Sequence, residues 1–138
     1  MVSKIIEIKT PGAGLYEITN EVVSVLRGVG IESGLCNVFI QHTSASLIIQ
    51  ENADPSAKMD LERWLERLVP EKDPLYTHTS EGPDDMPSHI KSILTQTSIS
   101  IPVVEGELML GTWQGIYVWE HRKAPHRRRV IVSFFGDL

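Results

Sequence analysis

The stretch SISIPVVEGELMLGTWQGIYVWEHRKAPHRRRVIVSFF, residues 98–135, decides the fold class. Its apolar runs are separated by glycines or charged turns and predict four strands: SISIPVV (98–104), ELMLGT (107–112), GIYVWEH (115–121) and RVIVSFF (129–135). No helical pattern lies between them. Consecutive strands without intervening helices pair antiparallel, so the sequence predicts an α+β fold with a largely antiparallel sheet or sheets.

Toward the N-terminus, three more strands are predicted from short apolar runs. SKIIEIK (3–9) is the first, and Pro11-Gly12 with Gly14 predicts a turn after it. LCNVFIQ (35–41) and ASLIIQE (45–51) are predicted as two neighbouring strands. The segment His42-Thr43-Ser44 separates them, so these polar residues are expected at a strand end.

About three helices are predicted, and the first has apolar residues at helical spacing: Ile18, Val22, Val25, Leu26 and Val29. We expect its N-cap near Thr19 or Asn20 and its end before Gly30.

The second predicted helix begins at Asp54-Pro55, because Asp caps a helix and Pro is tolerated in the first turn. It has an apolar stripe at Leu61, Trp64, Leu65 and Leu68. Pro70 ends this helix. A third helix is predicted from about Met86 to Thr97.

Size and composition predict one globular domain over residues 1–138. The formal net charge of −5 argues against nucleic acid as the main partner. No apolar run approaches the ~20 residues of a membrane span, so no membrane partner is expected. The N-terminus has no recognisable secretion signal, and a cytoplasmic setting is expected. Cys36 is the single cysteine and is expected in the core.

Basic residues gather near the C-terminus. Five of the thirteen lysines and arginines lie within eight positions: Arg122, Lys123, Arg127, Arg128 and Arg129. Such a patch on an acidic protein suits a small anionic ligand. A solvated hairpin loop with charged strand ends explains the same pattern, so both interpretations stay open.

Four of the five histidines lie in three short polar runs, namely QHTSAS (41–46), HTSEGPDDMPSH (78–89) and the GTWQG…EH stretch (111–121). Imidazole titrates near neutrality and is the commonest metal ligand. Histidines gathered beside acids and hydroxyls therefore indicate a site for chemistry or ligand binding. The second run overlaps an irregular stretch, residues 70–85, and long loops of this kind are often functional.

The run HTSEGPDDMPSH contains more acids than a helix start needs. One of Asp84 and Asp85 is sufficient to cap the third helix, and the other, with Glu81, is surplus. Adjacent carboxylates suit Mg²⁺, whereas His78 and His89 prefer Zn²⁺ or a similar ion. The spacing does not decide which metal binds.

In GIYVWEH, strand alternation puts Glu120 on one face with Ile116 and Val118. His121 shares the other face with two large aromatics, Tyr117 and Trp119. That face is expected either to line a pocket or to pack against another subunit. The nucleophile elbow G-x-S-x-G, the zinc motifs H-E-x-x-H and C-x-x-C, and the nucleotide-binding G-x-G-x-x-G and Walker A patterns do not occur in the sequence.

Five strings resemble the YjbQ family of small proteins, which are described as secondary thiamine-phosphate synthases: QHTSASL (41–47), EN-A-DP (51–55), EGPDDMPSHIKS (81–92), GTWQGI (111–116) and EHR (120–122). The resemblance spans almost the whole chain. It implies a homotrimer with a site near or between subunits and a cytoplasmic setting. It also implies low-level joining of a pyrimidine methyl diphosphate to a thiazole phosphate, with release of pyrophosphate.

The matched positions supply the residues of our hypothesis, a transferase that displaces pyrophosphate from a small phosphorylated metabolite with a divalent metal, Mg²⁺ or Zn²⁺, as cofactor. We expect His42, His78 and His89 to hold the metal. His121 is expected to act as acid or base, together with three carboxylates: Glu81, Asp84 and Asp85. Five residues are expected to bind the anionic substrate: Ser44, Lys91, Thr112, Gln114 and Arg122. The alternatives are a noncatalytic metal- or metabolite-binding protein and, third, a purely structural trimer module.

Overall fold

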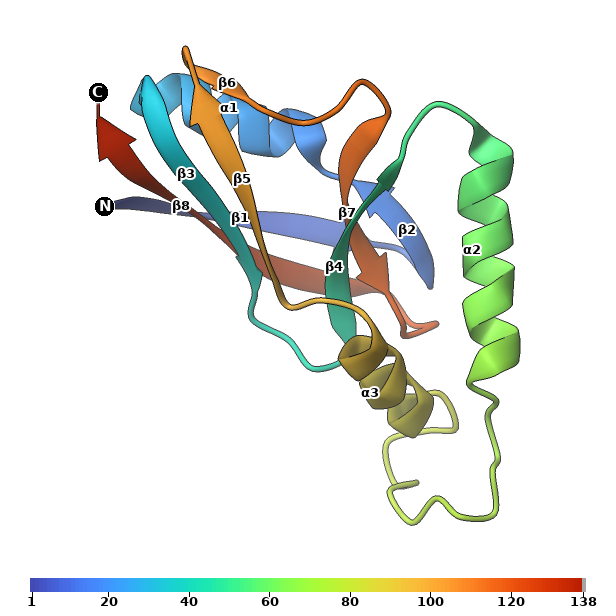
Figure 1. Ribbon diagram of the computed structural model, residues 1–138. Helices are drawn as coiled ribbons and strands as arrows, with labels where there is room; N and C mark the ends of the chain where they lie inside the picture. Colours follow the sequence, from blue (N-terminus) through green and yellow to red (C-terminus); the bar gives the residue numbers. More distant parts are fainter. Residues whose placement is uncertain (138) are drawn as a thin grey trace.

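The computed structural model describes residues 1–137, which form two antiparallel sheets and three helices (Figure 1). The larger sheet has the order β1 (Val2–Thr10), β8 (His126–Asp137), β3 (Ser33–Ile40), β5 (Ser98–Val104), β6 (Glu107–Leu108). The smaller sheet has the order β2 (Gly14–Glu17), β7 (Gln114–Glu120), β4 (Ala45–Glu51). The predicted α+β class with largely antiparallel sheets is confirmed.

The three helices are α1 (Thr19–Val29), α2 (Pro55–Leu68) and α3 (Asp85–Leu94). The predicted start of α2 is confirmed, because Asp54 accepts a hydrogen bond from the Ser56 amide at 2.9 Å. α1 begins near Thr19 as predicted, but neither Thr19 nor Asn20 is its N-cap. Ile18 is its N-cap and makes no side-chain cap bond, whereas the Thr19 hydroxyl donates to Glu17.

Alternating strand residues build the main core between the two sheets. Cys36 and Val38 of β3 point inward, and they meet Leu47 of β4 and Val118 of β7 from the other sheet. Cys36 is fully buried, as expected, and burial raises the pKa of its thiol to about 12. This cysteine is therefore a neutral core residue at physiological pH.

The outer face of the smaller sheet packs against α2. Tyr117 and Trp119 of β7 are buried there with Leu65 of α2 and Val69 just beyond the helix. α2 of the same chain covers much of the aromatic face, and Trp119 also lines a cavity beside that helix, as one of the two interpretations expected. The helical spacing of the α2 apolar residues and the alternation of β7 together explain this contact.

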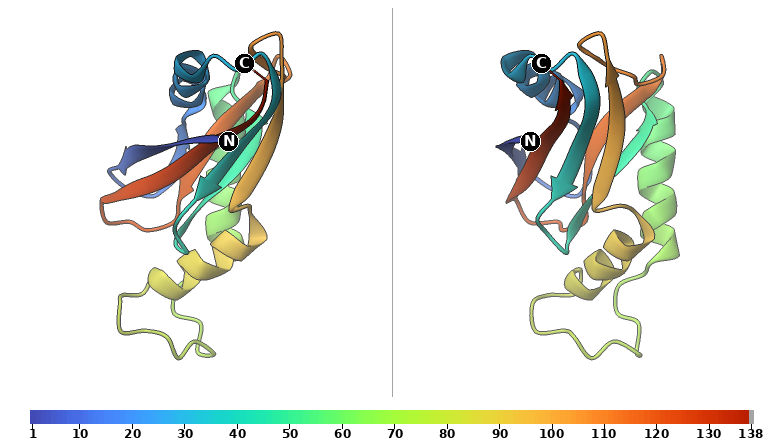
Figure 2. Two further views of the ribbon diagram at one scale, coloured as in Figure 1. Left: turned by 90° about the vertical axis from the view of Figure 1, so that its left-hand side faces the viewer. Right: turned by 60° about the vertical axis from the view of Figure 1, so that its left-hand side comes forward.

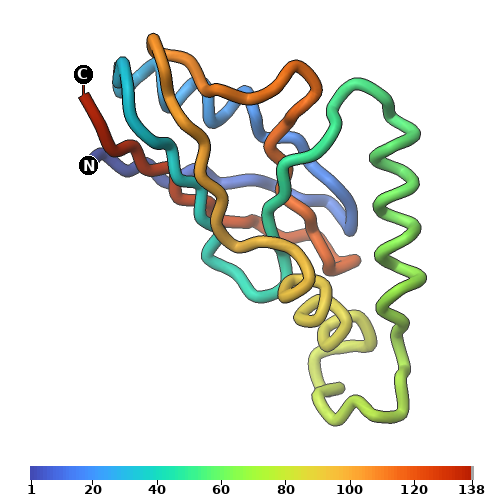
Figure 3. The backbone as a smooth tube through the Cα atoms, in the orientation of Figure 1, coloured from blue at the N-terminus to red at the C-terminus, as the bar shows by residue number. Residues whose placement is uncertain are grey.

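The predicted neighbours β3 and β4 do not pair, because they belong to different sheets. The segment 41–44 carries the chain from one sheet to the other and passes beside α3 (Figure 3). Several element boundaries also differ from prediction: α3 ends at Leu94 rather than near Thr97, and β8 begins at His126 rather than at residue 129. A short strand, β2, follows the predicted turn, and β6 ends at Leu108 rather than at residue 112.

The segment crossing between sheets and α3 lie at one end of the molecule, whereas α1 lies at the other (Figure 2). The loop 69–84 and α3 project beyond the sheets at that end. Among the described residues, no helix is both long and apolar enough to cross a membrane.

Candidate functional site

Three predicted site residues meet where the long loop joins α3. We call His78, Asp85 and His89 the His–Asp–His cluster. The Nε2 atoms of His78 and His89 lie 2.7 and 3.1 Å from the same oxygen, Oδ2 of Asp85. The i, i+4 spacing of Asp85 and His89 puts both on one face of α3. The carboxylate side chain is only 4% exposed and the His78 side chain 46%, so the cluster has a buried base and an open rim.

Arg122 holds the cluster from the loop between β7 and β8. Its Nη1 donates to Oδ1 of Asp85 at 2.7 Å, and its Nη2 donates to the Glu81 carbonyl at 2.9 Å. Burial by itself would raise the pKa of Asp85, but the His78 hydrogen bond and the charges of His89 and Arg122 outweigh it and lower the pKa. Asp85 is therefore a carboxylate at neutral pH.

Asp84 has a different role from its neighbour. Its Oδ2 accepts from the Lys123 amide at 2.8 Å and lies 3.3 Å from Nε of Arg122. It makes no side-chain cap bond to α3. Asp84 therefore ties the start of α3 to the β7–β8 loop and is not one of the cluster residues.

The protonation of His89 is constrained by its second nitrogen. Nδ1 lies 3.0 Å from the carbonyl oxygen of Thr43, and a carbonyl only accepts, so Nδ1 carries a hydrogen. A neutral His89 would then direct the lone pair of Nε2 at a carboxylate oxygen 3.1 Å away. That arrangement is repulsive unless a second proton or a metal cation lies between the two atoms.

His78 is not constrained in this way, because within residues 1–137 its Nδ1 makes no hydrogen bond. A neutral His78 can carry its hydrogen on Nε2 and donate to Asp85 at 2.7 Å. A divalent ion bound by Nε2 of both rings and by Asp85 would remove the conflict at His89 without a second proton on that ring. One ligand atom from each cluster residue lies within 4.8 Å of the others. Two imidazoles and one carboxylate suit zinc-type ions better than Mg²⁺, which prefers oxygen.

His42 does not join the cluster, contrary to the prediction. Its Nε2 accepts from the Arg129 amide at 2.8 Å, and its Nδ1 faces Arg128 at 3.3 Å. Its ring nitrogens are therefore directed at β8. His42 and His89 nevertheless line one cavity between the crossing segment and α3.

His121 is not a solvent-facing acid or base, which corrects the prediction. The residue is 2% exposed, and its Nε2 lies 2.9 Å from the hydroxyl oxygen of Ser46. Burial, followed by the charges of Lys91 and Arg128, lowers its pKa to about 3. The imidazole is therefore a neutral, buried hydrogen-bonding group at physiological pH.

The remaining predicted substrate-binding residues are engaged within the protein or lie elsewhere. The buried Lys91 ammonium contacts Oε1 of Glu66 at 2.5 Å, and the Ser44 hydroxyl accepts from Arg128 at 2.9 Å. Thr112 and Gln114 lie at the opposite end of β7 from Glu120, because Gln114 pairs with Glu51 whereas Glu120 pairs with Ala45. The structure does not bring Thr112 and Gln114 to the cluster.

The sequence analysis missed one buried ion pair. Glu120 of β7 and Arg128 of β8 form two hydrogen bonds, one of them 2.7 Å from Arg128 Nε to Glu120 Oε1. Thr10 donates to the same oxygen at 2.5 Å. Burial of Glu120 would raise its pKa, but these bonds lower it. Opposite charges at inward strand positions were the available signal, since Glu120 alternates with Val118 and Arg128 with Val130.

Most of the basic segment is neutralised by ion pairs. Arg122 pairs with Asp84 and Asp85, and the others pair as follows: Lys123 with Glu71, Arg127 with Glu7, and Arg128 with Glu120. Within residues 1–137, Arg129 makes no ion pair. The cationic patch predicted for an anionic ligand is thus smaller than its sequence implies.

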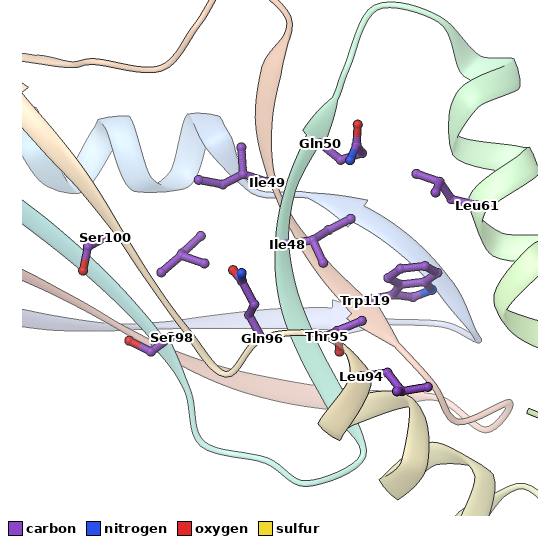
Figure 4. Close-up of a pocket in the computed structure, with 11 residues that line it drawn as sticks. Ile48, Ile49, Gln50, Leu61, Leu94, Thr95, Gln96, Ser98, Ser100 and Trp119 are labelled. Carbon is purple, nitrogen blue, oxygen red and sulfur yellow. The ribbon is translucent and has the colours of Figure 1, made fainter.

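A separate cavity of about 550 Å³ lies between β4, β5 and α2 (Figure 4). Figure 4 shows Trp119, Leu61 and Ile48 on its walls, together with the polar side chains of Gln50, Thr95 and Gln96. None of its lining side chains is ionisable at neutral pH. This cavity therefore lacks the ionisable side chains that the His–Asp–His cluster contains.

Comparison with known proteins shows which chains share this architecture. The family described as UPF0047 protein YjbQ-like matches residues 4–137. A UPF0047 protein of Synechocystis is 51% identical, covering 98% of this chain and 92% of its own. The UPF0047 protein YjbQ of Escherichia coli is 41% identical, covering 97% of each.

Two solved structures are similar over nearly their whole length. A hypothetical protein of Aeropyrum pernix has a TM-score of 0.91 at 29% identity, covering 99% of this chain and 100% of its own. A conserved hypothetical protein of Thermus thermophilus has a TM-score of 0.85 at 34% identity, covering 96% and 99%. The names of these four proteins state no reaction.

Proposed function

The chain belongs to the UPF0047 YjbQ-like family, and from that premise we propose that it is a metal-assisted transferase acting on a small phosphorylated metabolite. The hydrogen bond between Nδ1 of His89 and the Thr43 carbonyl carries the proposal. A backbone carbonyl at the second ring nitrogen is the usual way that proteins orient a metal-binding imidazole. It leaves Nε2 free to bind a cation together with Asp85 and His78.

The reaction that we propose is displacement of pyrophosphate, with thiamine-phosphate synthesis as a secondary activity. A divalent ion supplies stabilisation of negative charge on the leaving oxygen without a protein nucleophile. The exposed rim at His78 leaves room for a phosphate group. Arg122 keeps Asp85 ionised and oriented, because both of its Nη atoms are held by acceptors of the α3 start.

Glu81 is the group that we assign to proton transfer in place of His121. Its side chain is 63% exposed, and its Oε2 lies 3.3 Å from Nε2 of His78. An exposed carboxylate at the rim can accept a proton from an incoming substrate and release it to solvent. His121 lacks that access because it is buried.

One observation favours the alternative, a noncatalytic metal- or metabolite-binding protein. The charged groups expected to contact substrate, Lys91 and Arg122, are already paired with Glu66, Asp84 and Asp85. Catalysis of phosphate transfer usually requires free cations around the leaving group. Binding without turnover requires only the His–Asp–His cluster.

Metal content tests the shared part of both proposals. Protein purified without a histidine tag should contain about one zinc-type ion per chain by elemental analysis. His89→Asn should lose it, whereas His126→Asn should keep it, because the His126 ring bonds to the Ala124 carbonyl and is not part of the cluster. Equal metal content in the two variants would remove the cluster from metal binding.

Turnover separates the enzyme from the binding protein. Pyrophosphate release from the pyrimidine methyl diphosphate and the thiazole phosphate should be lost in Asp85→Asn, with the fold checked by circular dichroism. Asparagine keeps the shape of the side chain while removing its charge. Ligand-linked thermal stabilisation without product in the wild type would favour the binding protein.

The proposal includes a homotrimer in the cytoplasm. Support for self-association comes from the outer face of the larger sheet, where Ile5, Leu35, Phe39 and Phe135 are 40–53% exposed. Large apolar side chains gathered on an open sheet face are typical of interfaces. A charged phosphorylated substrate does not cross a bilayer unaided, which supports a cytoplasmic setting.

A further inference from the structure

His42 and Arg128 point two hydrogen-bond donors at each other. The Arg129 amide donates to Nε2 of His42 at 2.8 Å, so a neutral His42 carries its hydrogen on Nδ1. Nδ1 lies 3.3 Å from Nη1 of Arg128, which also only donates. Two N–H donors cannot bond to each other. Both are therefore available to an acceptor placed between them.

The guanidinium of Arg128 is only partly used by Glu120. Nε and Nη2 donate to the carboxylate, and Nη2 also donates to the Ser44 hydroxyl at 2.9 Å. Among the described residues, Nη1 meets only His42. One edge of a buried, permanently charged group is thus left for an outside acceptor.

The charges around His42 favour a negatively charged acceptor. Arg128, Arg129 and His126 act on the ring as positive or titratable groups, and Glu120 is the opposing charge. Burial and then the charge of Arg128 lower the pKa of His42, which keeps the ring neutral at physiological pH. An oxyanion would face more positive than negative charge here.

His42 lies on the wall of a cavity of about 510 Å³ that His89 also lines. Ser92 of α3 lines the same cavity, and its buried hydroxyl has no partner among residues 1–137. Ile93 gives part of the wall an apolar surface. A buried hydroxyl without a partner in the protein usually forms a hydrogen bond with a ligand group or a water molecule. The cavity thus connects His42 to the ring of a cluster histidine, and Nη1 of the buried Arg128 lies 3.3 Å from Nδ1 of His42.

We propose that His42 and Arg128 form an oxyanion subsite, which binds a phosphate or carboxylate group of the substrate through the Nδ1 and Nη1 hydrogens. The inference deepens the proposed function and rests on it for the identity of the ligand as a substrate. The substrate is then a small metabolite with two polar ends: one reaches the His–Asp–His cluster and the other, an oxyanion, reaches Arg128. Its middle lies against Ser92 and Ile93.

Calorimetric titration of metal-free protein tests the subsite separately from the metal. The protein is stripped with a chelator and titrated with inorganic phosphate and, in a second arm, with malonate as a carboxylate probe. His42→Ala should weaken binding by about tenfold, because one hydrogen bond to a charged group is lost. Thr97→Val is the matched control, since Thr97 lines the same cavity without donating to the oxyanion, and should stay within about twofold.

Unchanged affinity in His42→Ala would overturn the subsite, and so would binding that occurs only after metal loading. The second result would leave the proposed metal-assisted function standing. Phosphate binding to a wild-type protein that takes up no metal would support the subsite and contradict the proposed metal-assisted function. Tighter binding of phosphate than of malonate would indicate that the substrate presents a phosphate group to this subsite, and the opposite order would indicate a carboxylate.

A measurement on the unaltered protein covers the case in which His42→Ala does not fold. With ¹⁵N-labelled histidine, the Nδ1–H signal of His42 should shift on addition of phosphate, whereas the signals of the buried His121 should not. A His42 signal that stays in place at saturating phosphate contradicts the subsite.

Discussion

Glu120 and Arg128 join the two sheets through one buried pair. Glu120 belongs to the smaller sheet and Arg128 to the larger, and both are almost fully buried. Their bonds extend to Thr10 of β1 and Ser44 of the crossing segment. Four segments therefore converge on two side chains. Such a pair specifies which strand ends meet, because an unpaired charge there is costly.

Removing one partner of this pair should destabilise the fold strongly. Arg128→Met leaves Glu120 buried without its cation, and we expect a loss of about 3–5 kcal/mol in the free energy of unfolding. Urea unfolding followed by circular dichroism measures it. Arg127→Met is the control, since Arg127 pairs with Glu7 on the exposed face. Equal effects of the two changes would contradict the role of the buried pair.

His121 should make stability depend on pH in a defined window. Its pKa is about 3 in the folded protein and 6.5 in the unfolded reference, so below pH 6.5 the unfolded chain takes up a proton that the folded chain does not. Stability is therefore fully present above pH 6.5 and declines as pH falls toward 3, by at most about 1.4 kcal/mol per pH unit. Unfolding in urea at several pH values above 4.5 isolates this effect from carboxylate titration.

His121→Gln is the test, since glutamine cannot be protonated there. The decline between pH 6.5 and 4.5 should flatten in this variant relative to wild type. A slope that stays unchanged would show that other groups cause the acid sensitivity.

At the scale of elements, β3 and β8 approach each other through paired glycines. Gly34 and Gly136 are register partners with φ of 153° and 146°. A Cβ at Gly34 would lie 1.9 Å from the Phe135 carbonyl oxygen. The two strands can pair along their whole length only because neither residue has a side chain. β8 thus pairs with β3 along one side, while β1 pairs with it along the other.

Gly34→Ala should therefore lower the melting temperature, because backbone atoms must separate to admit the methyl group. Gly28→Ala is the matched control. Gly28 is inside α1, and within the described chain nothing lies within 4 Å of its added Cβ. That change should stabilise the protein by about 0.5–1 kcal/mol, since alanine favours helix. Differential scanning fluorimetry compares both, and a neutral Gly34→Ala would contradict the packing argument.

At the scale of the whole molecule, the outer faces of the two sheets differ in what covers them. α2 covers the outer face of the smaller sheet, whereas the outer face of the larger sheet exposes four large apolar side chains: Ile5, Leu35, Phe39 and Phe135. The cluster end lies at the junction of both sheets with α3 (Figure 1). The exposed face is the surface that we assign to contact between copies of the chain.

Phe39→Glu should convert a homotrimer to monomers, because a charge in an apolar interface is not compensated. Light scattering after size exclusion gives the mass directly. Trp64→Glu is the control, since Trp64 is similarly exposed on α2, away from that face. A wild-type protein that is monomeric, or a trimer that survives Phe39→Glu, would contradict the assignment.

The sequence predicted most of the helices and strands, but only some of the candidate site residues lie together in the structure. Short apolar runs located β1, β3, β4, β5, β7 and β8, and helical spacing located α1, α2 and α3, because these patterns are local properties of the chain. His78, Asp85 and His89 were among the candidates, since they are close in sequence. Thr112 and Gln114 were expected nearby and lie at the far end of β7. The motif that contains them is visible in neighbouring residues, but its distance from the cluster depends on how the strands pair.

The sequence alone determined the α+β class, the strand alternation that puts Glu120 inward, and the cap that starts α2 at Asp54. Only the tertiary structure decided that β3 and β4 enter different sheets, that His121 is buried and that His42 faces Arg128 rather than the cluster. These outcomes depend on hydrogen bonds between residues 75 to 87 positions apart, such as His121 to Ser46 and His42 to the Arg129 amide. The protonation state and the orientation of a side chain depend on the residues that folding places beside it. The spacing of apolar residues along the sequence does not specify which residues those are.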